Sequence, residues 1–161
     1  MVNEAKIQVV LNHLDKELHR FIDTIGEIPY VAMPSEKPEI ICFSREIKNL
    51  TGYDVNEILE DREHWADMIH PDDQELVFDA FARCKDEGTS FYAEYRIVHK
   101  NGSLRYVSDR GEPVFDNEGR VIQIDGIITP LGEIKEPGDI PLLEVKQVTN
   151  SYVNSNNFQK I

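Results

Sequence analysis

The clearest alternation of apolar and polar positions lies between residues 91 and 129 and predicts three consecutive antiparallel strands. In the first strand, residues 91–97, every second side chain is expected on one face, because side chains in a strand repeat every two residues. That apolar face comprises Phe91, Ala93, Tyr95 and Ile97. Asn101-Gly102 is expected to supply the two positive-φ positions of a type I′ hairpin turn, which leads into a second strand over residues 104–114. A longer turn then precedes the third strand, residues 121–128.

A different pattern, over residues 4–25, has the period of a helix. Six apolar residues recur at alternating intervals of four and three, which places them in one stripe along the helix. They are Ile7, Leu11, Leu14, Leu18, Phe21 and Ile25. The stripe predicts an amphipathic helix that either lies on its own sheet or forms a seam joining two copies of the chain. About three heptads are marginal for a stable coiled coil alone, so both interpretations stay open.

Two short strands are predicted after this helix, at Ile28–Met33 and Glu39–Phe43. Ser44 is placed to cap a following helix that runs through Leu50. Asp54, with a glutamate three residues later at Glu57, indicates a capping-box start for another short helix.

A longer helix is predicted from Pro71 to Glu87. Proline suits the first helical position, and Gly88 is placed to end the helix. The paired carboxylates of Asp72 and Asp73 favour the positive end of the helix, which is a structural role and not acid–base catalysis. One face is apolar and is expected to lie over the sheet: Leu76, Val77, Ala80, Phe81 and Cys84.

The order of these elements predicts an α+β fold with a five-stranded antiparallel sheet, helices covering one face, and an N-terminal amphipathic helix. We divide the chain into an N-terminal amphipathic or dimerisation helix (residues 1–25), a central domain (26–133) and a C-terminal linker or tail (134–161). The tail is rich in Asn and Ser with only isolated apolar residues.

Charge and composition narrow the classes of partner. The net charge of −13 repels phosphate backbones and anionic lipids, so nucleic-acid binding is disfavoured. No apolar run approaches the roughly 20 residues that span a bilayer, and the N-terminus lacks a secretory pattern. We therefore expect a cytoplasmic domain without membrane insertion. Cys42 and Cys84 lie far apart without metal-ligand spacing, which indicates free thiols and no metal site.

Several motifs follow one another in an order and spacing that resemble the PAS family, in its bacterial sensory-box form with a C-terminal PAC segment. They are Leu50-Thr-Gly-Tyr53, Glu57-Ile-Leu59, Trp65 with Ile69-His-Pro-Asp-Asp73, Phe91 with Glu94-Tyr-Arg-Ile97, Lys100-Asn-Gly-Ser103, Tyr106-Val107, Pro113-Val114, Asp116, Gly119 and Gly126-Ile127. The resemblance covers roughly residues 26–133. It implies a non-catalytic signalling module that passes a conformational change to an effector, such as a histidine kinase or a diguanylate cyclase.

The resemblance also implies candidate pocket residues, which are Phe43, Tyr53, Trp65, Phe81, Tyr95, Ile97, Val107 and Ile128. Such a wall suits a small apolar ligand. The same bulky side chains can instead fill the core themselves, which leaves a dimerisation or relay module without a ligand. No catalytic constellation competes with these readings: the chain has no phosphate-binding glycine loop and no serine in the context of an activated nucleophile.

Two cofactors known from the family fit the sequence poorly. Flavin-binding members hold the flavin edge with three amide side chains, and the matching positions here are Ile97, Val107 and Ile128. A flavin's polar edge would lose its hydrogen bonds there, at about 1–3 kcal/mol per buried group. Haem requires an axial ligand, usually histidine. His70 suits a helix cap and His99 a hairpin turn, so a haem-binding sensor is kept only as a second alternative.

One departure from the family pattern concerns the end of the last strand. Pro130-Leu131-Gly132 stands where the family usually has Asp-Ile-Thr. Proline removes a hydrogen-bond donor and glycine loosens the chain, which places output through a C-terminal helix in doubt. Output through the N-terminal helix, or through rearrangement of a homodimer, is the corresponding hypothesis.

Overall fold

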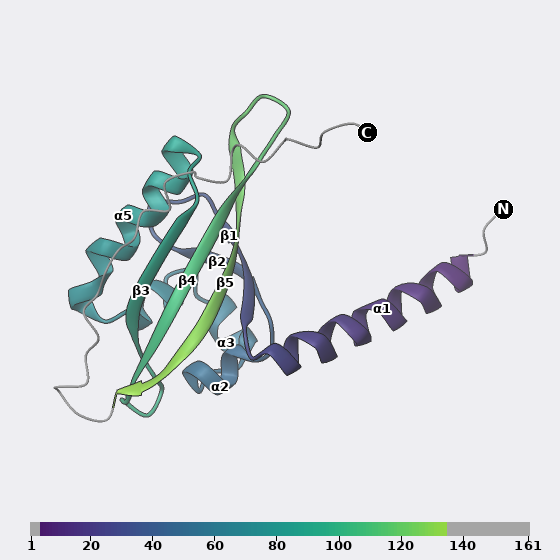
Figure 1. The fold of residues 1–161 in the computed structure, drawn as a ribbon, viewed down its shortest axis with the longest axis horizontal. Coiled ribbons are helices and arrows are strands. Elements are labelled where there is room, and N and C mark those ends of the chain that lie inside the picture. The colour runs from purple at the N-terminus through teal and green to yellow at the C-terminus, as the bar shows by residue number, and fades with distance from the viewer. Residues whose placement is uncertain (1–3, 135–161) are drawn as a thin grey trace, which may run out of the picture.

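The computed structural model describes residues 4–134, which form one antiparallel sheet, four helices packed on it and one projecting helix (Figure 1). The helices are α1 (Glu4–Ile25), α2 (Ile47–Thr51), α3 (Val55–Leu59), α4 (His64–Met68) and α5 (Pro71–Glu87). The strands are β1 (Ile28–Met33), β2 (Glu39–Phe43), β3 (Phe91–Val98), β4 (Leu104–Phe115) and β5 (Val121–Ile134). The predicted α+β class is confirmed, whereas the predicted tail lies outside the described residues.

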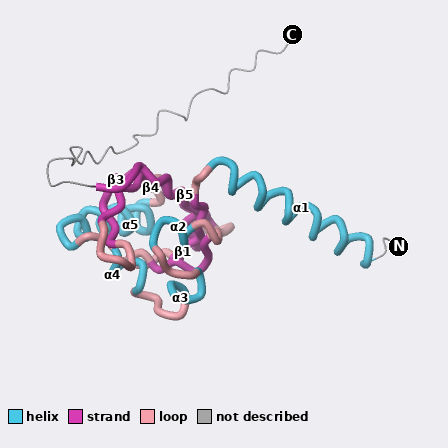
Figure 2. Tube along the Cα trace, turned by 90° about the horizontal axis from the view of Figure 1, so that it is seen from below, coloured by secondary structure: helices cyan, strands magenta, loops and turns pink. Residues whose placement is uncertain are grey.

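The five strands are ordered β2-β1-β5-β4-β3, and every neighbouring pair is antiparallel. The last strand therefore lies in the middle of the sheet, between β1 and β4. The helices α2–α5 lie on one side of the sheet (Figure 2). A hairpin around Asn101-Gly102 is confirmed by the register that places Val98 opposite Leu104, but the predicted type I′ turn is wrong, because residues 99–103 form the loop and only Gly102 has a positive φ.

The last strand is longer than the sequence pattern predicts, because β5 continues past Ile128 to Ile134. The register shifts so that Pro130 lies opposite Val107 and Gly132 opposite Tyr106, which leaves Leu131 as an extra residue in a bulge. A bulge admits a proline that a regular ladder position would exclude. Pro130 thus distorts the strand without ending it, and the predicted end at residue 128 is wrong.

The helix termini follow the sequence in two places and depart from it in a third. Asp54 donates its backbone N–H to the Glu57 carboxylate at 2.8 Å, as the capping box predicts. His70 precedes α5 and accepts the backbone N–H of Asp72 through Nδ1. The helix predicted to start at Ser44 begins only at Ile47, where Glu46 is the capping residue without a side-chain cap bond. The predicted Ser44 cap is therefore wrong, because a turn separates Ser44 from the helix.

The core lies between the sheet and the helices. Phe91, Ala93, Tyr95 and Ile97 are all buried there, as the alternation of β3 predicts. From α5 the buried residues are Val77, Ala80, Phe81 and Cys84, while Leu76 is only partly buried. The predicted inward faces of β3 and α5 therefore meet, and α5 packs mainly against β3.

An ion pair joins the start of α5 to β3. The Arg96 guanidinium donates to both carboxylate oxygens of Asp73, at 2.8 and 2.6 Å, and the backbone N–H of Arg96 donates to the same carboxylate. Burial opposes ionisation of Asp73, but the hydrogen bonds from Arg96 outweigh it and lower the pKa of the carboxyl. Asp73 is thus fixed chiefly by an arginine partner, in addition to its place at the helix N-terminus.

Candidate functional site

The eight predicted pocket residues are brought together by the fold. Seven of them are buried members of the hydrophobic core cluster: Phe43, Trp65, Phe81, Tyr95, Ile97, Val107 and Ile128. Tyr53 lies at the rim and is only partly buried. Its ring meets His64 edge-on, with centroids 4.7 Å apart, and the Lys100 ammonium lies 4.8 Å from the ring centroid. Tyr53, in the link between α2 and α3, is therefore a surface contact to α4 and the β3–β4 hairpin more than a wall of the core.

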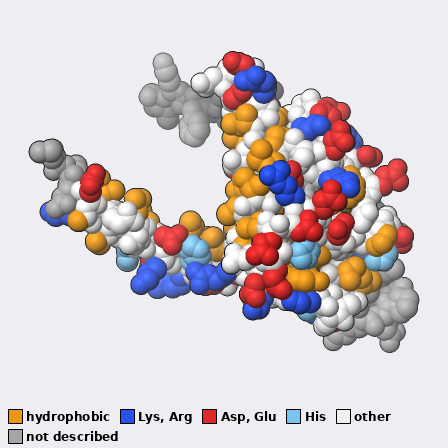
Figure 3. Space-filling model, turned by 180° about the vertical axis from the view of Figure 1, so that it is seen from behind, with side chains coloured by type: hydrophobic (Ala, Val, Ile, Leu, Met, Phe, Trp, Pro, Cys, Tyr) orange, Lys and Arg blue, Asp and Glu red, His pale blue; other side chains and the backbone are white. Residues whose placement is uncertain are grey.

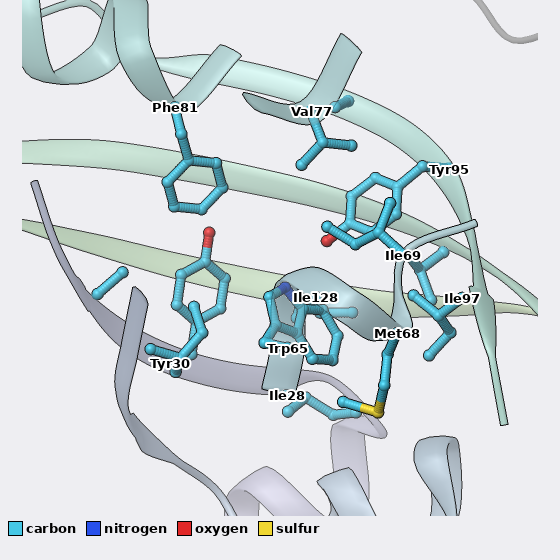
Figure 4. Close-up of a cluster of buried hydrophobic side chains, with 14 of the residues drawn as sticks. Ile28, Tyr30, Trp65, Met68, Ile69, Val77, Phe81, Tyr95, Ile97 and Ile128 are labelled. Carbon is cyan, nitrogen blue, oxygen red and sulfur yellow. The ribbon is translucent and has the colours of Figure 1, made fainter. Parts of the chain in front are cut away.

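Several aromatic rings of this core contact one another, and Figure 4 shows Tyr30, Trp65, Phe81 and Tyr95 directed toward the same interior. Phe43 and Trp65 have ring centroids 5.2 Å apart, and Phe81 lies 4.8 Å from Phe91 and 6.5 Å from Tyr30. Three hollows that are lined entirely by described residues include none of the eight predicted pocket residues. This packing supports the alternative in which the domain fills its own core.

Two glycines allow two of these rings to lie against the sheet. Gly111 and Gly126 face each other across β4 and β5, with Phe91 and Tyr30 as their neighbours on the outer sides. A Cβ at Gly126 would lie 2.0 Å from the Tyr30 ring, and one at Gly111 would lie 2.1 Å from the Phe91 ring. The absence of side chains at both positions therefore fixes where Tyr30 and Phe91 can pack.

The one carboxylate within this cluster belongs to Asp109, at the centre of β4, and it is 1% exposed. The Tyr30 hydroxyl on β1 donates to its Oδ1 at 2.9 Å, and the Tyr95 hydroxyl on β3 donates to its Oδ2 at 2.8 Å. One side chain thus links three strands of the sheet. No arginine, lysine or histidine among the described residues forms an ion pair with Asp109 at 4.0 Å or less.

Burial raises the pKa of Asp109 from 3.8 to about 7, although the hydroxyls of Tyr95 and Tyr30 act in the opposite direction. The physical cause is that a charged carboxylate loses its hydration in the core and receives only neutral donors in return. Burial also raises the pKa of Tyr30 and of Tyr95 well above 10, so both remain neutral donors. Asp109 is therefore the group in this cluster that changes charge near neutral pH.

Trp65 of α4 is the fourth residue of this cluster. Its indole nitrogen is buried and makes no hydrogen bond of standard geometry. The nitrogen lies on the side of the ring that faces the hydroxyls of Tyr30 and Tyr95 (Figure 4). Its N–H acts to lower the pKa of Tyr95, in opposition to the larger effect of burial. The core is thus apolar in most of its volume but has one polar centre formed by Asp109, Tyr30, Tyr95 and Trp65.

Asp109 and Tyr30 are not among the site residues that the sequence predicts. A signal for Asp109 was present, because Val107, Asp109 and Gly111 alternate in β4 with outward Ser108 and Arg110. A charged residue on the inward face of a predicted strand indicates a buried polar centre. Its partner Tyr30 lies 79 residues away, and only the long-range order of the strands reveals that pairing.

The two cofactor predictions can be compared with the geometry. Ile97, Val107 and Ile128 are all fully buried, so the three positions that would face a flavin edge present only hydrocarbon. All five histidines lie within the described residues, and none is buried. His64 Nδ1 contacts the Glu57 carbonyl, and His99 Nδ1 accepts the Asn101 N–H. Neither cofactor fits the residues of this core, and no cluster of three metal-binding side chains occurs among the described residues.

The second candidate site is the apolar seam of α1, defined as Ile7, Leu11, Leu14, Leu18, Phe21 and Ile25. Every one of these side chains is between 44% and 62% exposed, and α1 has no buried residue. The helix extends away from the domain (Figures 1 and 2), and hydrophobic side chains appear at the surface along its length (Figure 3). Contact of α1 with its own sheet is therefore not seen, and this seam lacks a partner within the described chain.

Comparison with known proteins agrees with this geometry. The model of the PAS fold family matches residues 40–128, more than half of the chain. The chain therefore belongs to the PAS family, as its motifs indicated. Its fold also matches the N-terminal domain of a diguanylate cyclase with PAS/PAC sensor from Marinobacter aquaeolei, with a TM-score of 0.57 and 24% identity, over 66% of this chain and 95% of that one. None of the described helices is long and apolar enough to cross a membrane.

Two further relatives belong to signalling proteins. A sensory box histidine kinase/response regulator from Burkholderia thailandensis matches with a TM-score of 0.53 and 22% identity, over 69% of this chain and 81% of that one. The methyl sulfide methyltransferase-associated sensor of Methanosarcina acetivorans is 27% identical over 129 residues, which is 80% of this chain but only 13% of that protein. Another relative, protein y4lL of Sinorhizobium fredii, is matched over 10% of its length. The chain thus spans a small part of the curated relatives that it matches.

Proposed function

We propose that this chain is a non-catalytic PAS signalling module that forms a homodimer through α1 and relays conformational change in its core to an effector. The observation that carries the proposal is the exposed apolar seam of α1. A helix of 22 residues is about 33 Å long, and its seam runs for most of that length. A second copy of the same seam is the simplest partner, because matching heptad positions pack against each other.

The energetics predict a dimer of modest affinity. Burying a fully exposed aliphatic or aromatic side chain stabilises by about 1.5–3 kcal/mol, so each half-exposed seam residue contributes about 1 kcal/mol. Six residues on each of two helices give on the order of 10 kcal/mol. Association itself costs roughly 4–15 kcal/mol in lost freedom, so at the low end of that cost about 6 kcal/mol remains, which corresponds to a dissociation constant between about 1 μM and 1 mM. We therefore expect dissociation in a concentration range that light scattering and sedimentation can reach.

Related proteins support the assignment of an effector. The relatives named above include a diguanylate cyclase and a histidine kinase, in which a PAS domain forms one part of a larger signalling protein. An effector of one of these two classes, in the same chain or in a partner protein, is accordingly proposed here. Only two residues, Gly26 and Glu27, separate α1 from β1, so the proposed route from β1 to α1 is short.

The dimer is tested by replacing two seam residues with charges. In Leu14→Asp/Leu18→Asp the seam receives two buried carboxylates, and the variant is expected to be a monomer by multi-angle light scattering while its circular dichroism remains that of the wild type. Asn12→Asp/His13→Asp is the matched control, because it adds the same two carboxylates beside the seam. A wild-type protein that is monomeric at all concentrations, or a seam variant that still dimerises, would exclude this function for α1.

A small-molecule sensor is the second candidate, and the indole N–H of Trp65 favours it, because this N–H makes no hydrogen bond of standard geometry and a bound acceptor could provide one. Native mass spectrometry compared with a denatured sample distinguishes the two candidates. A mass difference that disappears on denaturation supports a sensor of a small, largely apolar ligand. Identical masses after expression in unrelated hosts support the relay module with a self-filled core.

A further inference from the structure

We propose that the cluster of Asp109, Tyr30 and Tyr95 is a proton-operated switch, which closes the core when Asp109 is protonated and favours opening of β1 when Asp109 is ionised. The inference rests on the proposed function only in its last step, where β1 acts on α1. The switch itself depends on two hydrogen bonds within the sheet, from Tyr30 and Tyr95 to Asp109, and on the position of Trp65 of α4 beside them.

The first step is the chemistry of the sealed cluster. An ionised Asp109 accepts both tyrosine hydroxyls, but its charge then lies in the core with neutral neighbours only. A protonated Asp109 carries no such charge, and its own O–H finds an acceptor in a tyrosine oxygen, which can accept as well as donate. The ionised carboxylate thus gains two hydrogen bonds, and the protonated carboxyl avoids a buried charge. The ratio of the two states depends on pH.

The second step concerns the charges around Asp109 on each element that packs against it. From β1 the titratable neighbour is Tyr30, and from β3 it is Tyr95. From α5 it is Cys84, which interacts with Tyr30; burial raises the pKa of that thiol to about 11, so it is neutral. Trp65 of α4 does not titrate, and the strand neighbours of Asp109 are Ala93 and Ile128. None of these groups supplies a positive charge that would hold Asp109 ionised.

The third step is the direction of the response. Opening of the sheet admits water to Asp109 and returns its carboxyl to ordinary acidity. An ionised Asp109 therefore favours the open form and a protonated one favours the closed form. We follow β1 because it supplies Tyr30 to Asp109 and leads directly from α1; it is paired with β2 on one side and β5 on the other, so its amide protection reports on the loss of the Tyr30 contact. A raised pH thus loosens the strand that carries α1.

Local measurements on the full 161-residue chain test this directly. The carboxyl carbon of Asp109 is followed by NMR from pH 5 to 9, and the fluorescence of Trp65, the single tryptophan, is recorded in parallel. Both are expected to titrate with a midpoint near pH 7. Hydrogen exchange of β1 amides, corrected for the intrinsic rise in rate with pH, is expected to show at least tenfold lower protection at pH 8 than at pH 5.5.

Variants separate Asp109 from other titrating groups. In Asp109→Asn the fluorescence change and the pH dependence of β1 protection should disappear. Asp125→Asn, an exposed change of the same kind on β5, should titrate like the wild type. If Asp109→Asn does not fold, Tyr95→Phe provides the test: removing a donor to the ionised carboxyl should move the midpoint to higher pH. An Asp109 midpoint below pH 5, or equal changes in protection with and without Asp109, would overturn the switch.

The test is independent of the dimer. Light scattering at pH 5.5 and 8 reports on α1, whereas NMR and exchange report on the core. A monomer in which Asp109 titrates and β1 opens retains the switch and excludes the dimer function. A dimer in which Asp109 does not titrate excludes the switch and retains the dimer.

Discussion

The buried carboxyl of Asp109 should leave a measurable trace in the global stability of the domain. In the unfolded chain this carboxyl has its ordinary pKa of 3.8, and in the folded domain burial raises the pKa to about 7. Below about pH 4 the carboxyl is protonated in both states. Between those two values the folded state holds a proton that the unfolded state has released. The free energy of unfolding therefore falls as the pH rises, and the fall ends near pH 7.

The magnitude follows from the two pKa values. Each unit of difference corresponds to 1.36 kcal/mol, so a difference of about 3 units corresponds to about 4 kcal/mol. Relaxation and water penetration reduce such penalties, and a fall of at least ~1 kcal/mol is therefore the expected minimum. For a domain whose total stability is roughly 5–15 kcal/mol, this contribution is large enough to measure.

The assay is urea unfolding of the wild type and of Asp109→Asn at intervals between pH 4 and pH 8.5. The asparagine amide has nearly the same shape but never ionises, so the difference between the two curves isolates the charge at position 109. Titration of other groups, including Asp73 and Glu57 with their lowered pKa, is common to both proteins. A constant offset reflects altered hydrogen bonds to the tyrosines. Parallel curves across the whole range would refute the reasoning, because they would show that Asp109 has the same protonation in both states.

Three further outcomes are expected from the packing. Gly126→Ala places a methyl group 2.0 Å from the Tyr30 ring, and urea unfolding should show a loss of about 2 kcal/mol that shrinks in a Tyr30→Leu background. Arg96→Met leaves the buried Asp73 carboxylate without its partner and should cost about 3 kcal/mol in the same assay, whereas the double variant Asp73→Asn/Arg96→Met should recover part of that loss. Iodoacetamide at pH 8 should label exposed Cys42 in the native protein and Cys84 only after unfolding, as mass spectrometry can show. Equal labelling rates of the two thiols in the native protein would contradict the burial of Cys84 and the raised pKa of its thiol.

Patterns among residues close in sequence predict most of the helices and strands. Alternation in residues 91–97 and the helical period of residues 4–25 depend on neighbours in sequence, and both predictions are confirmed. The hairpin at Asn101-Gly102 is confirmed too, but its turn type is not, because only Gly102 has a positive φ. Ser44 as a helix cap was a local prediction too, but it depended on the first helical residue, which a turn at 45–46 displaces. Element boundaries are set by competition between turns and helices that a capping residue alone does not decide.

The polar centre of the core could not be found by the same means. Asp109 appears in sequence as one of many carboxylates in an acidic chain, and Tyr30 as one of six tyrosines. Their relationship arises because β5 enters the sheet between β1 and β4, so that side chains 79 residues apart meet across it. Arg96 is a similar case. The alternation of β3 places its side chain on the face that points away from the core, and only the approach of α5 to the sheet edge supplies Asp73 as its partner.

The continuation of β5 to Ile134 places the last residues of β5 near the link between α1 and β1. Because β5 is antiparallel to β1, residues after Ile128 run back alongside the link between α1 and β1, where the Thr129 hydroxyl donates to Glu27. Asp23 and Gly26 from the α1 end, together with Pro130 and Gly132 from the β5 end, line one hollow of about 390 Å³. Both exits from the sheet therefore lie at the same corner. In the proposed relay, a displacement of β1 acts there on α1 and on the end of β5 together, so Pro130 does not by itself separate an N-terminal from a C-terminal route of output.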